Sequence, residues 1–221
     1  MCGRYTIAAH AEQLAERFGA ALPSEMLLQP RYNAAPLQML PVVLQDDGRR
    51  VALFRWGLMP RWAKDPSIAN KLINARAETL EEKPSFRDAL RRRRCLVPAD
   101  GFYEWQKLPE GKIPMRMTLR SGELFAMAGL WESWKDPATG ELLHTFTIIT
   151  TSPNELMSPI HNRMPAILAP EHEALWLDQS AGPEVWRDLL RPCPAEILRA
   201  YPVSSQVNNP RVDHPSLIDA L

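Results

Sequence analysis

The chain has few cysteines and no long apolar run. Its 221 residues include three cysteines, Cys2, Cys95 and Cys193, which lie far apart and form no CxxC pair. An odd number of widely spaced cysteines argues against a disulfide framework. No apolar segment approaches the roughly 20 residues that a membrane-spanning helix needs. Since the first residues carry no apolar stretch behind a basic one, we predict no secretory signal and expect a soluble, cytoplasmic protein.

The chain also lacks net charge, internal repeats and low-complexity segments. Its 26 basic and 26 acidic residues cancel, which excludes a nucleic-acid binder driven by overall charge but not a local basic face. A 45% hydrophobic fraction is ordinary for a globular protein. A chain of this length buries about 70% of its unfolded surface. We therefore expect a single domain over residues 1–221.

Hydrophobic periodicity and turn residues predict short strands alternating with short helices. Helices are expected at residues 10–18 before Gly19, 86–93, 170–178 and 183–190, and after the capping-box pattern SPNE at 152–155. Strands are expected at 41–44 and 51–56, joined by a turn at Asp47-Gly48, and at 95–97, 102–106, 114–119, 124–131, 144–151 and 201–207. These patterns indicate an α+β fold with a mainly antiparallel sheet core.

Cys2 is the most informative position. Because its side chain is small, we expect methionine aminopeptidase to remove Met1 and leave a terminal cysteine. About 10–17% of an α-amine is free base at pH 7, against about 0.04% of a lysine, so the terminal amine is the stronger nucleophile. An aldehyde would form a Schiff base with this amine, and the thiol would close a five-membered thiazolidine on the same carbon. Gly3, Arg4 and Tyr5 add flexibility, a cation that would lower the thiol pKa and an aromatic anchor.

Three polar clusters stand in apolar surroundings. The first runs from Asn74 to Glu78. In the second, Glu104 lies among aromatic residues, where desolvation would raise its pKa. In the third, His161 is a titrating imidazole beside a cation, Arg163. Each cluster also has a structural interpretation: Glu104 would pair with an arginine, Asn74 would cap a turn and His161 would be a hydrogen-bonded loop residue.

Basic and aromatic residues supply candidate contacts to nucleic acid. The arginine run at residues 91–94 is typical of a solvated helix face. Other arginines lie inside motifs that contain a candidate reactive group: Arg4, Arg31, Arg76 and Arg163. Three tryptophans would either stack on bases, at about 1–3 kcal/mol per base, or belong to the core: Trp56, Trp62 and Trp105.

The clusters belong to a series of motifs that spans most of the chain. The motifs are MCGRY at 1–5, RYNAAP at 31–36, WGLMP at 56–60, INARAE at 73–78, PADGFYEW at 98–105, HNRMP at 161–165, PVS at 202–204 and VN at 207–208. In this order they resemble the SOS-response-associated peptidase (SRAP) family of abasic-site-processing proteins. The resemblance implies two curved, mainly antiparallel sheets in a barrel-like core with peripheral helices. It also implies a shallow basic groove for single-stranded DNA, with Cys2 at its floor.

The resemblance further assigns roles by position. The ring-opened form of an abasic sugar is an aldehyde, the electrophile that the amine and thiol of Cys2 need. Glu104 would be the general acid/base, His161 would donate or shuttle a proton, and Asn74 would hold the terminus or the sugar. Contacts to DNA are implied for Arg4, Asn33, Pro36, Trp62, Arg76 and Arg163, of which the arginines would bind phosphates. No cofactor or metal is implied, and we expect a monomer that joins the nucleoid when it binds DNA.

Three functions are therefore open at this level. The first is covalent capture of abasic sites in single-stranded DNA, with lyase activity and self-removal of Met1. The second is a thiol peptidase in which Cys2 attacks a peptide bond with its own amine or His161 as base. The third is a non-catalytic single-strand binder with strongly salt-dependent affinity. A metal site of Cys2, Cys95 and His161 is the least supported, because no usual ligand spacing occurs.

Overall fold

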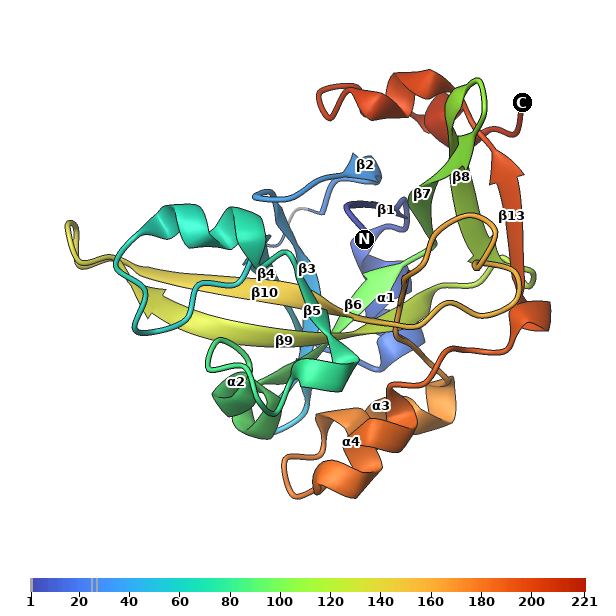
Figure 1. Ribbon diagram of the computed structural model, residues 1–221. Coiled ribbons are helices and arrows are strands. Elements are labelled where there is room, and N and C mark those ends of the chain that lie inside the picture. Colours follow the sequence, from blue (N-terminus) through green and yellow to red (C-terminus); the bar gives the residue numbers. More distant parts are fainter. Residues whose placement is uncertain (1, 25, 27) are drawn as a thin grey trace.

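The computed structural model describes residues 2–24, 26 and 28–221. Its strands form two sheets (Figure 1). The strands are β1 (Arg4–Ile7), β2 (Arg31–Ala34), β3 (Met39–Gln45), β4 (Arg49–Trp56), β5 (Asn74–Arg76), β6 (Arg94–Ala99), β7 (Gly101–Leu108), β8 (Gly111–Leu119), β9 (Phe125–Lys135), β10 (Leu142–Thr151), β11 (Met164–Pro165), β12 (Ile167–Leu168) and β13 (Leu198–Pro202). The α-helices are α1 (Ala11–Phe18), α2 (Arg87–Arg92), α3 (Pro170–Leu177) and α4 (Pro183–Leu189). Shorter 3₁₀ helices are η1 (Pro66–Lys71), η2 (Ala77–Thr79), η3 (Ala195–Ile197), η4 (Ser205–Asn208) and η5 (Pro215–Ile218).

The larger sheet closes on itself. Its order is β11-β10-β4-β3-β6-β9-β12, and β9 also pairs with β10, so β4, β3, β6, β9 and β10 form a ring. Within this ring the pairing of β10 with β4 is parallel and the other pairings are antiparallel. A second sheet, β13-β8-β7-β1-β2, is antiparallel throughout. The expected α+β fold with a barrel-like, mainly antiparallel core and peripheral helices is confirmed.

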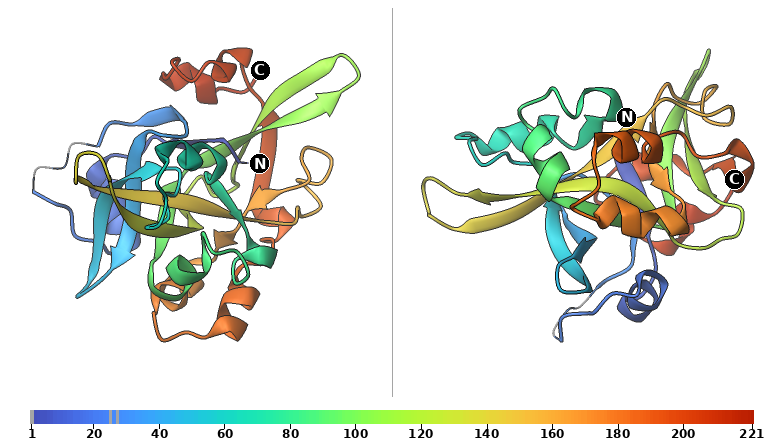
Figure 2. Two further views of the ribbon diagram at one scale, coloured as in Figure 1. Left: turned by 60° about the vertical axis from the view of Figure 1, so that its left-hand side comes forward. Right: turned by 90° about the horizontal axis from the view of Figure 1, so that it is seen from below.

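A single main core joins the two sheets and the helices. The apolar face of α1 contributes Leu14 and Phe18, one helical turn apart, and Gly19 ends this helix with a left-handed φ of 56°. Trp176 of α3 and Trp186 of α4 belong to the same core. Figures 1 and 2 show α3 and α4 together on one side of the barrel and the β7–β8 hairpin projecting from its body.

Most predicted elements are present, and two differ. No helix follows residues 152–155, where the chain forms a series of turns. Asn154 and Met157 each accept an i+4 amide bond, from Ser158 and His161, but Pro159 has no N–H to continue the pattern. The strand expected at residues 201–207 starts earlier, as β13, and ends at Pro202 before η4.

The segment between β4 and η1 is held by backbone constraints. Gly57 has a φ of 123°, and a Cβ there would lie 2.8 Å from the carbonyl oxygen of Ala69, so glycine is required. Trp134 donates its indole N–H to the carbonyl oxygen of Ala63 at 2.7 Å. These contacts place the intervening Trp62 at a defined position on the surface.

The sequence suggested that the arginine run at residues 91–94 is a solvated helix face. The structure shows that this is not true of the whole run. Arg94 is only 4% exposed and donates to the carbonyl oxygens of Leu90, at 2.5 Å, and Trp176, at 2.6 Å. It also donates to the carbonyl oxygen of Asp178, and its guanidinium lies 5.0 Å from the ring centroid of Trp186. Arg94 therefore ties α2, α3 and α4 to the barrel.

Replacing Arg94 with lysine is expected to lower the free energy of unfolding by about 2–4 kcal/mol. A single ammonium group cannot reach carbonyl oxygens that a guanidinium reaches in three directions. Urea denaturation would measure the change, with Arg92→Lys on the exposed side of α2 as the control, expected within about 0.5 kcal/mol of the parent. Equal midpoints for the two variants would contradict this role.

Candidate active site

The N-terminal segment enters the antiparallel sheet as β1. Tyr5 anchors it, since its ring is buried and makes an edge contact with Trp56 at 5.3 Å between centroids. Cys2 has no exposed surface in this chain, which still carries Met1 in its sequence. Its thiol donates a weak bond to the carbonyl oxygen of Arg4 at 3.8 Å. The expected aromatic anchor is thus present, and the cysteine lies inside the fold rather than on a frayed terminus.

Asn74 binds the backbone of Cys2 directly. Its Nδ2 donates to the Cys2 carbonyl oxygen at 2.9 Å. Asn74 begins β5, which pairs in parallel with β10 opposite Ile148. The preceding residue, Ile73, accepts the indole N–H of Trp56 at 2.8 Å. The buried residues Trp56 and Ile148 thus hold the segment that presents the Asn74 amide to Cys2.

Glu104 approaches Cys2 from the adjacent strand. Arg4 of β1 lies opposite Tyr103 of β7, so the residues before Arg4 run beside Glu104. The carboxyl group is almost completely buried, and this burial raises the pKa of Glu104 while the nearby charge of His161 opposes the rise. A carboxyl group with a raised pKa is suited to proton transfer near neutral pH.

His161 completes the cluster from the turns that follow β10. Its Nδ1 lies 3.8 Å from Oε1 of Glu104. The backbone N–H of Arg163 donates to the same Nδ1 at 3.1 Å, and the His161 amide donates to the Met157 carbonyl oxygen at 2.8 Å. The Arg163 carbonyl oxygen lies 3.2 Å from the same Nδ1, so this nitrogen accepts from the Arg163 N–H in one tautomer and donates to the Arg163 carbonyl oxygen in the other. Cys2, Asn74, Glu104 and His161, the residues assigned to catalysis from the sequence, therefore lie together.

The electrostatics of Cys2 differ from the sequence prediction. Burial raises the pKa of the Cys2 thiol, and the negative charge of Glu104 raises it further. The charge of Arg4, which was expected to lower this pKa, is not among these effects, although the hydrogen bond to the Arg4 backbone opposes the rise. The Arg4 guanidinium donates to the Gly3 carbonyl oxygen at 3.3 Å. The sulfur is therefore a neutral thiol at neutral pH.

The residues expected to contact DNA fall into two groups. Trp62 is 58% exposed, Arg76 is exposed, and Arg4 and Pro36 are half-buried, so these four have surface available for a ligand. The other two, Asn33 and Arg163, are occupied by contacts within the protein.

Asn33 has no exposed surface, so a direct contact of its side chain with DNA, as expected from the sequence, is not available in this structure. Its Nδ2 donates instead to backbone oxygens of the C-terminal segment: Val212 at 2.8 Å, Asn209 at 3.0 Å and Val207 at 3.2 Å. Asp213 accepts the Asn33 backbone N–H at 3.0 Å. Asn33 therefore holds the segment that follows β13 against β2.

Replacing Asn33 with alanine is expected to lower the free energy of unfolding by about 1–3 kcal/mol, because buried carbonyl oxygens lose their donor. Amide hydrogen exchange should quicken between residues 205 and 217. The exposed Asn70→Ala, which removes a single bond to the Ser67 carbonyl oxygen at 3.3 Å, is the control. A similar denaturation midpoint for both variants would refute this assignment.

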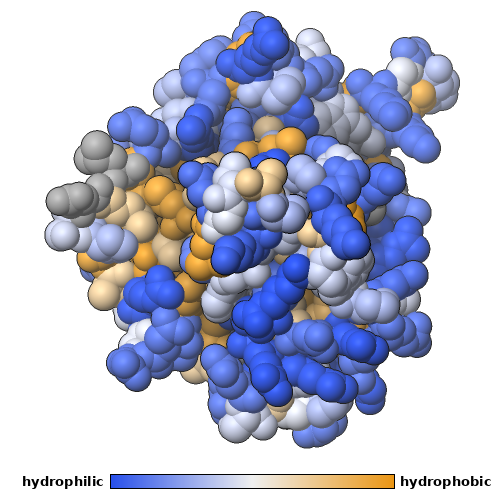
Figure 3. All heavy atoms as spheres, turned by 90° about the vertical axis from the view of Figure 1, so that its left-hand side faces the viewer, coloured by the Kyte–Doolittle hydropathy of each residue, from blue (hydrophilic) through white to orange (hydrophobic). Residues whose placement is uncertain are grey.

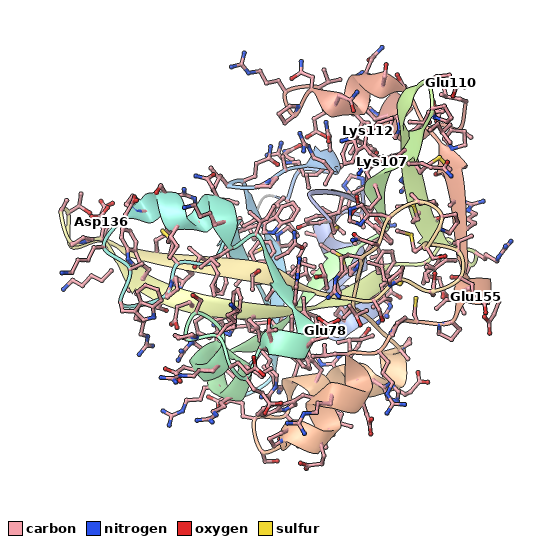
Figure 4. The ribbon with its side chains drawn as sticks, viewed as in Figure 1. Glu78, Lys107, Glu110, Lys112, Asp136 and Glu155 are labelled. Atoms are coloured by element: carbon pink, nitrogen blue, oxygen red, sulfur yellow. The ribbon has the colours of Figure 1, made fainter. Side chains whose placement is uncertain are left out.

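Arg163 is paired rather than available. Its guanidinium binds both carboxylate oxygens of Glu78, at 2.6 and 2.9 Å, and the Thr150 carbonyl oxygen at 2.5 Å. This pairing lowers the pKa of Glu78. Figure 4 shows Glu78 at the end of β5, in η2. The contacts fasten the turn that carries His161 to η2 and β10, so a phosphate would have to compete with Glu78 for this cation.

Among the tryptophans proposed to stack on bases, Trp56 belongs to the buried core. Trp105 is half-buried and donates its indole N–H to Oδ1 of Asn208 at 2.6 Å. The sequence reasoning missed the pairing of Glu78 with Arg163, although Glu78 stood in the cluster that begins at Asn74. Nothing in either motif indicated that the two residues, so far apart along the chain, would meet.

Within residues 2–24, 26 and 28–221, no group of three or more histidine, cysteine, aspartate or glutamate side chains is arranged to hold a metal ion. In the same part of the chain, no helix is both long and apolar enough to cross a membrane.

Comparison with known proteins defines the class to which this fold and site belong. Residues 1–210 match the model of the family "SOS response associated peptidase (SRAP)", and the chain belongs to this family, as its motifs indicated. It is 49% identical over 225 residues to the "Abasic site processing protein YoqW" of Bacillus subtilis (strain 168), with all of both chains covered. It is 36% identical over 263 residues to the "Abasic site processing protein HMCES" of Gallus gallus, covering 99% of this chain and 77% of that one. A crystal structure of a protein from Bacteroides thetaiotaomicron superposes with a TM-score of 0.92 at 32% identity, covering all of both chains.

Proposed function

We propose that this protein captures abasic sites in single-stranded DNA by forming a thiazolidine with the terminal amine and thiol of Cys2 after loss of Met1. The observation that carries the proposal is the meeting of Cys2, Asn74, Glu104 and His161, which come from four separate segments of the chain. Relatives that match this chain over most of its length are named abasic site processing proteins, which supports an abasic site as the substrate.

The first chemical step would be imine formation. Glu104, whose protonated form is favoured by burial, would donate a proton to the ring oxygen, while the C1′ hydroxyl gives up its proton to solvent and the sugar opens to its aldehyde. The Cys2 amine would then attack the aldehyde carbon, C1′. His161 would supply the proton with which the hydroxyl leaves as water and would then take a proton back from the nitrogen, so that the C=N bond of a neutral Schiff base remains. Asn74 would hold the Cys2 carbonyl in place during this attack.

The second step would close the ring. The Cys2 sulfur adds to the imine carbon, and the thiol proton passes to the nitrogen, so no atom is lost. Because the thiol pKa is raised, Glu104 in its carboxylate form would accept that proton from the sulfur during the addition and pass it to the nitrogen. Before closure, removal of a C2′ proton from the Schiff base would expel the 3′-phosphate, which is the proposed lyase reaction. Rapid closure would therefore favour the cross-link over strand cleavage.

Intact mass spectrometry tests the proposal in one measurement. Purified protein should lack Met1. After incubation with an oligonucleotide containing one abasic site, its mass should rise by that of the DNA minus one water, and the adduct should survive heating. Protein that retains Met1 throughout, or that forms no adduct with the abasic strand, would overturn the proposal.

A further inference from the structure

A concave region lies beside Trp62, and Cys2 is not among the residues that line it. It is a hollow of about 280 Å³, which we call the α2 hollow. Its lining comes from the segment after β4, from α2 and its flanks, and from β9, and it includes Trp62, Glu132 and the arginines Arg61, Arg91, Arg92 and Arg93. Trp62 also lines another hollow, of about 430 Å³, whose charged residues are Lys64, Lys71 and Asp65, with one more cation than acids. The exposed indole thus stands between two cation-lined hollows.

The charge of the α2 hollow is positive. Its lining holds four arginines against two acids. The buried Glu132 is neutralised by Arg93 at 2.7 Å and by Arg61 at 3.0 Å, and the exposed Asp88 pairs with Arg87 at 3.7 Å. Arg91 and Arg92 are exposed, and among the described residues neither of them forms an ion pair, unlike their neighbours Arg87 and Arg93. Figure 3 shows the face of the molecule that lies on the left-hand side of Figure 1. Hydrophilic side chains cover most of the lower part of that face, at the height of α2 in Figure 1.

The hollow also holds an unused donor. The side chain of Arg93 is 12% exposed, and its Nε is buried with no hydrogen-bond partner in the described structure. Its backbone is fixed, since the Arg93 N–H donates to Ala89 and its carbonyl oxygen accepts from Trp131. A fixed guanidinium with spare donors, next to two unpaired guanidinium groups, matches the oxygens of a phosphate.

We propose that the α2 hollow is a phosphate-binding subsite for the DNA strand, with Trp62 stacking on an adjacent base. The proposal rests on the function proposed above. Along a strand, phosphates alternate with bases, and the order of cationic hollow, exposed indole and second cationic hollow matches two phosphates flanking one base. Residues of η1 line one hollow and residues of α2 the other, and β5, which carries Asn74, lies between these two helices in the chain.

The double variant Arg91→Gln/Arg92→Gln tests the subsite. Both residues are exposed, so folding should be unchanged. The probe is a fluorescent single strand of intact bases, titrated at several salt concentrations. Loss of two phosphate contacts should reduce the slope of log K against log salt by about 1.4 and weaken binding roughly tenfold at low salt. The control Arg50→Gln/Arg120→Gln removes the same charge from exposed positions outside both hollows and should leave the slope unchanged.

DNA strands with and without a 5′-terminal phosphate distinguish binding of a backbone phosphate from binding of a terminal one. An equal loss with and without a 5′-terminal phosphate identifies a backbone phosphate, which we expect, and a loss confined to the phosphorylated strand identifies a terminal one. If the double variant and its control bind alike on every strand, the subsite does not exist. Failure of the proposed function would look different: the unaltered protein would then form no adduct with abasic DNA, whatever its salt dependence.

Discussion

Replacement of Cys2 by alanine is expected to abolish the heat-stable adduct with abasic DNA. The variant keeps a terminal amine once Met1 is removed, so it still forms an imine, but it has no sulfur to close the ring. We expect the heat-resistant product to fall by at least about 100-fold. Borohydride reduction should still trap the imine, and denaturing electrophoresis of heated and reduced samples would distinguish the two products.

Two matched variants make this result specific. Cys193→Ala removes another buried thiol, outside the site, and should leave the adduct unchanged. A glycine inserted before Cys2 keeps the thiol but moves the terminal amine to another residue, and should also prevent ring formation. If Cys2→Ala gave as much heat-stable adduct as Cys193→Ala, the sulfur of Cys2 would have no part in the linkage.

Replacement of Glu104 by glutamine is expected to slow adduct formation by about 10²–10⁴-fold, because an amide fills the same space but transfers no proton. In the unaltered protein the rate of sugar opening should fall as pH rises through the raised pKa of this carboxyl. The variant should lack that dependence. The measurement is the initial rate of adduct formation between about pH 5 and 9.

The control for this variant is Glu110→Gln. Glu110 is exposed in the β7–β8 turn, and Figure 4 shows it at the tip of this hairpin. Its loss should not alter the rate. A rate for Glu104→Gln within about threefold of the control would remove Glu104 from the mechanism.

The stability of the unaltered protein relative to Glu104→Gln should change with pH in a defined direction. Burial raises the pKa of Glu104 in the folded state, so ionisation opposes folding. The stability of the unaltered protein relative to Glu104→Gln is therefore greatest below the ordinary glutamate pKa and declines as pH rises through the raised one. Urea denaturation across this range should show the variant gaining on the parent as pH increases. The opposite trend would mean that charge pairing with His161 outweighs burial.

Local sequence patterns were sufficient for much of this protein. The periodicity of Leu14 and Phe18 with a following Gly19 predicted α1, and the Asp47-Gly48 turn predicted the β3–β4 hairpin. The order of the short motifs was sufficient to identify the family. These features depend on neighbours in the chain, such as helix period, turn conformation and residue identity, and such information is written in consecutive residues.

Only the spatial packing decided which polar side chains are buried and which groups of the site have shifted pKa values. Arg94 and Arg92 look equivalent in the sequence, but one is buried beneath α3 and the other is exposed. The thiol pKa of Cys2 rises because β7 brings Glu104 beside it and the core excludes water. Asn33 turned inward because the C-terminal segment offers it backbone oxygens from residues more than 170 positions away. Desolvation and long-range pairing depend on which distant segments meet, and no local window of residues contains that information.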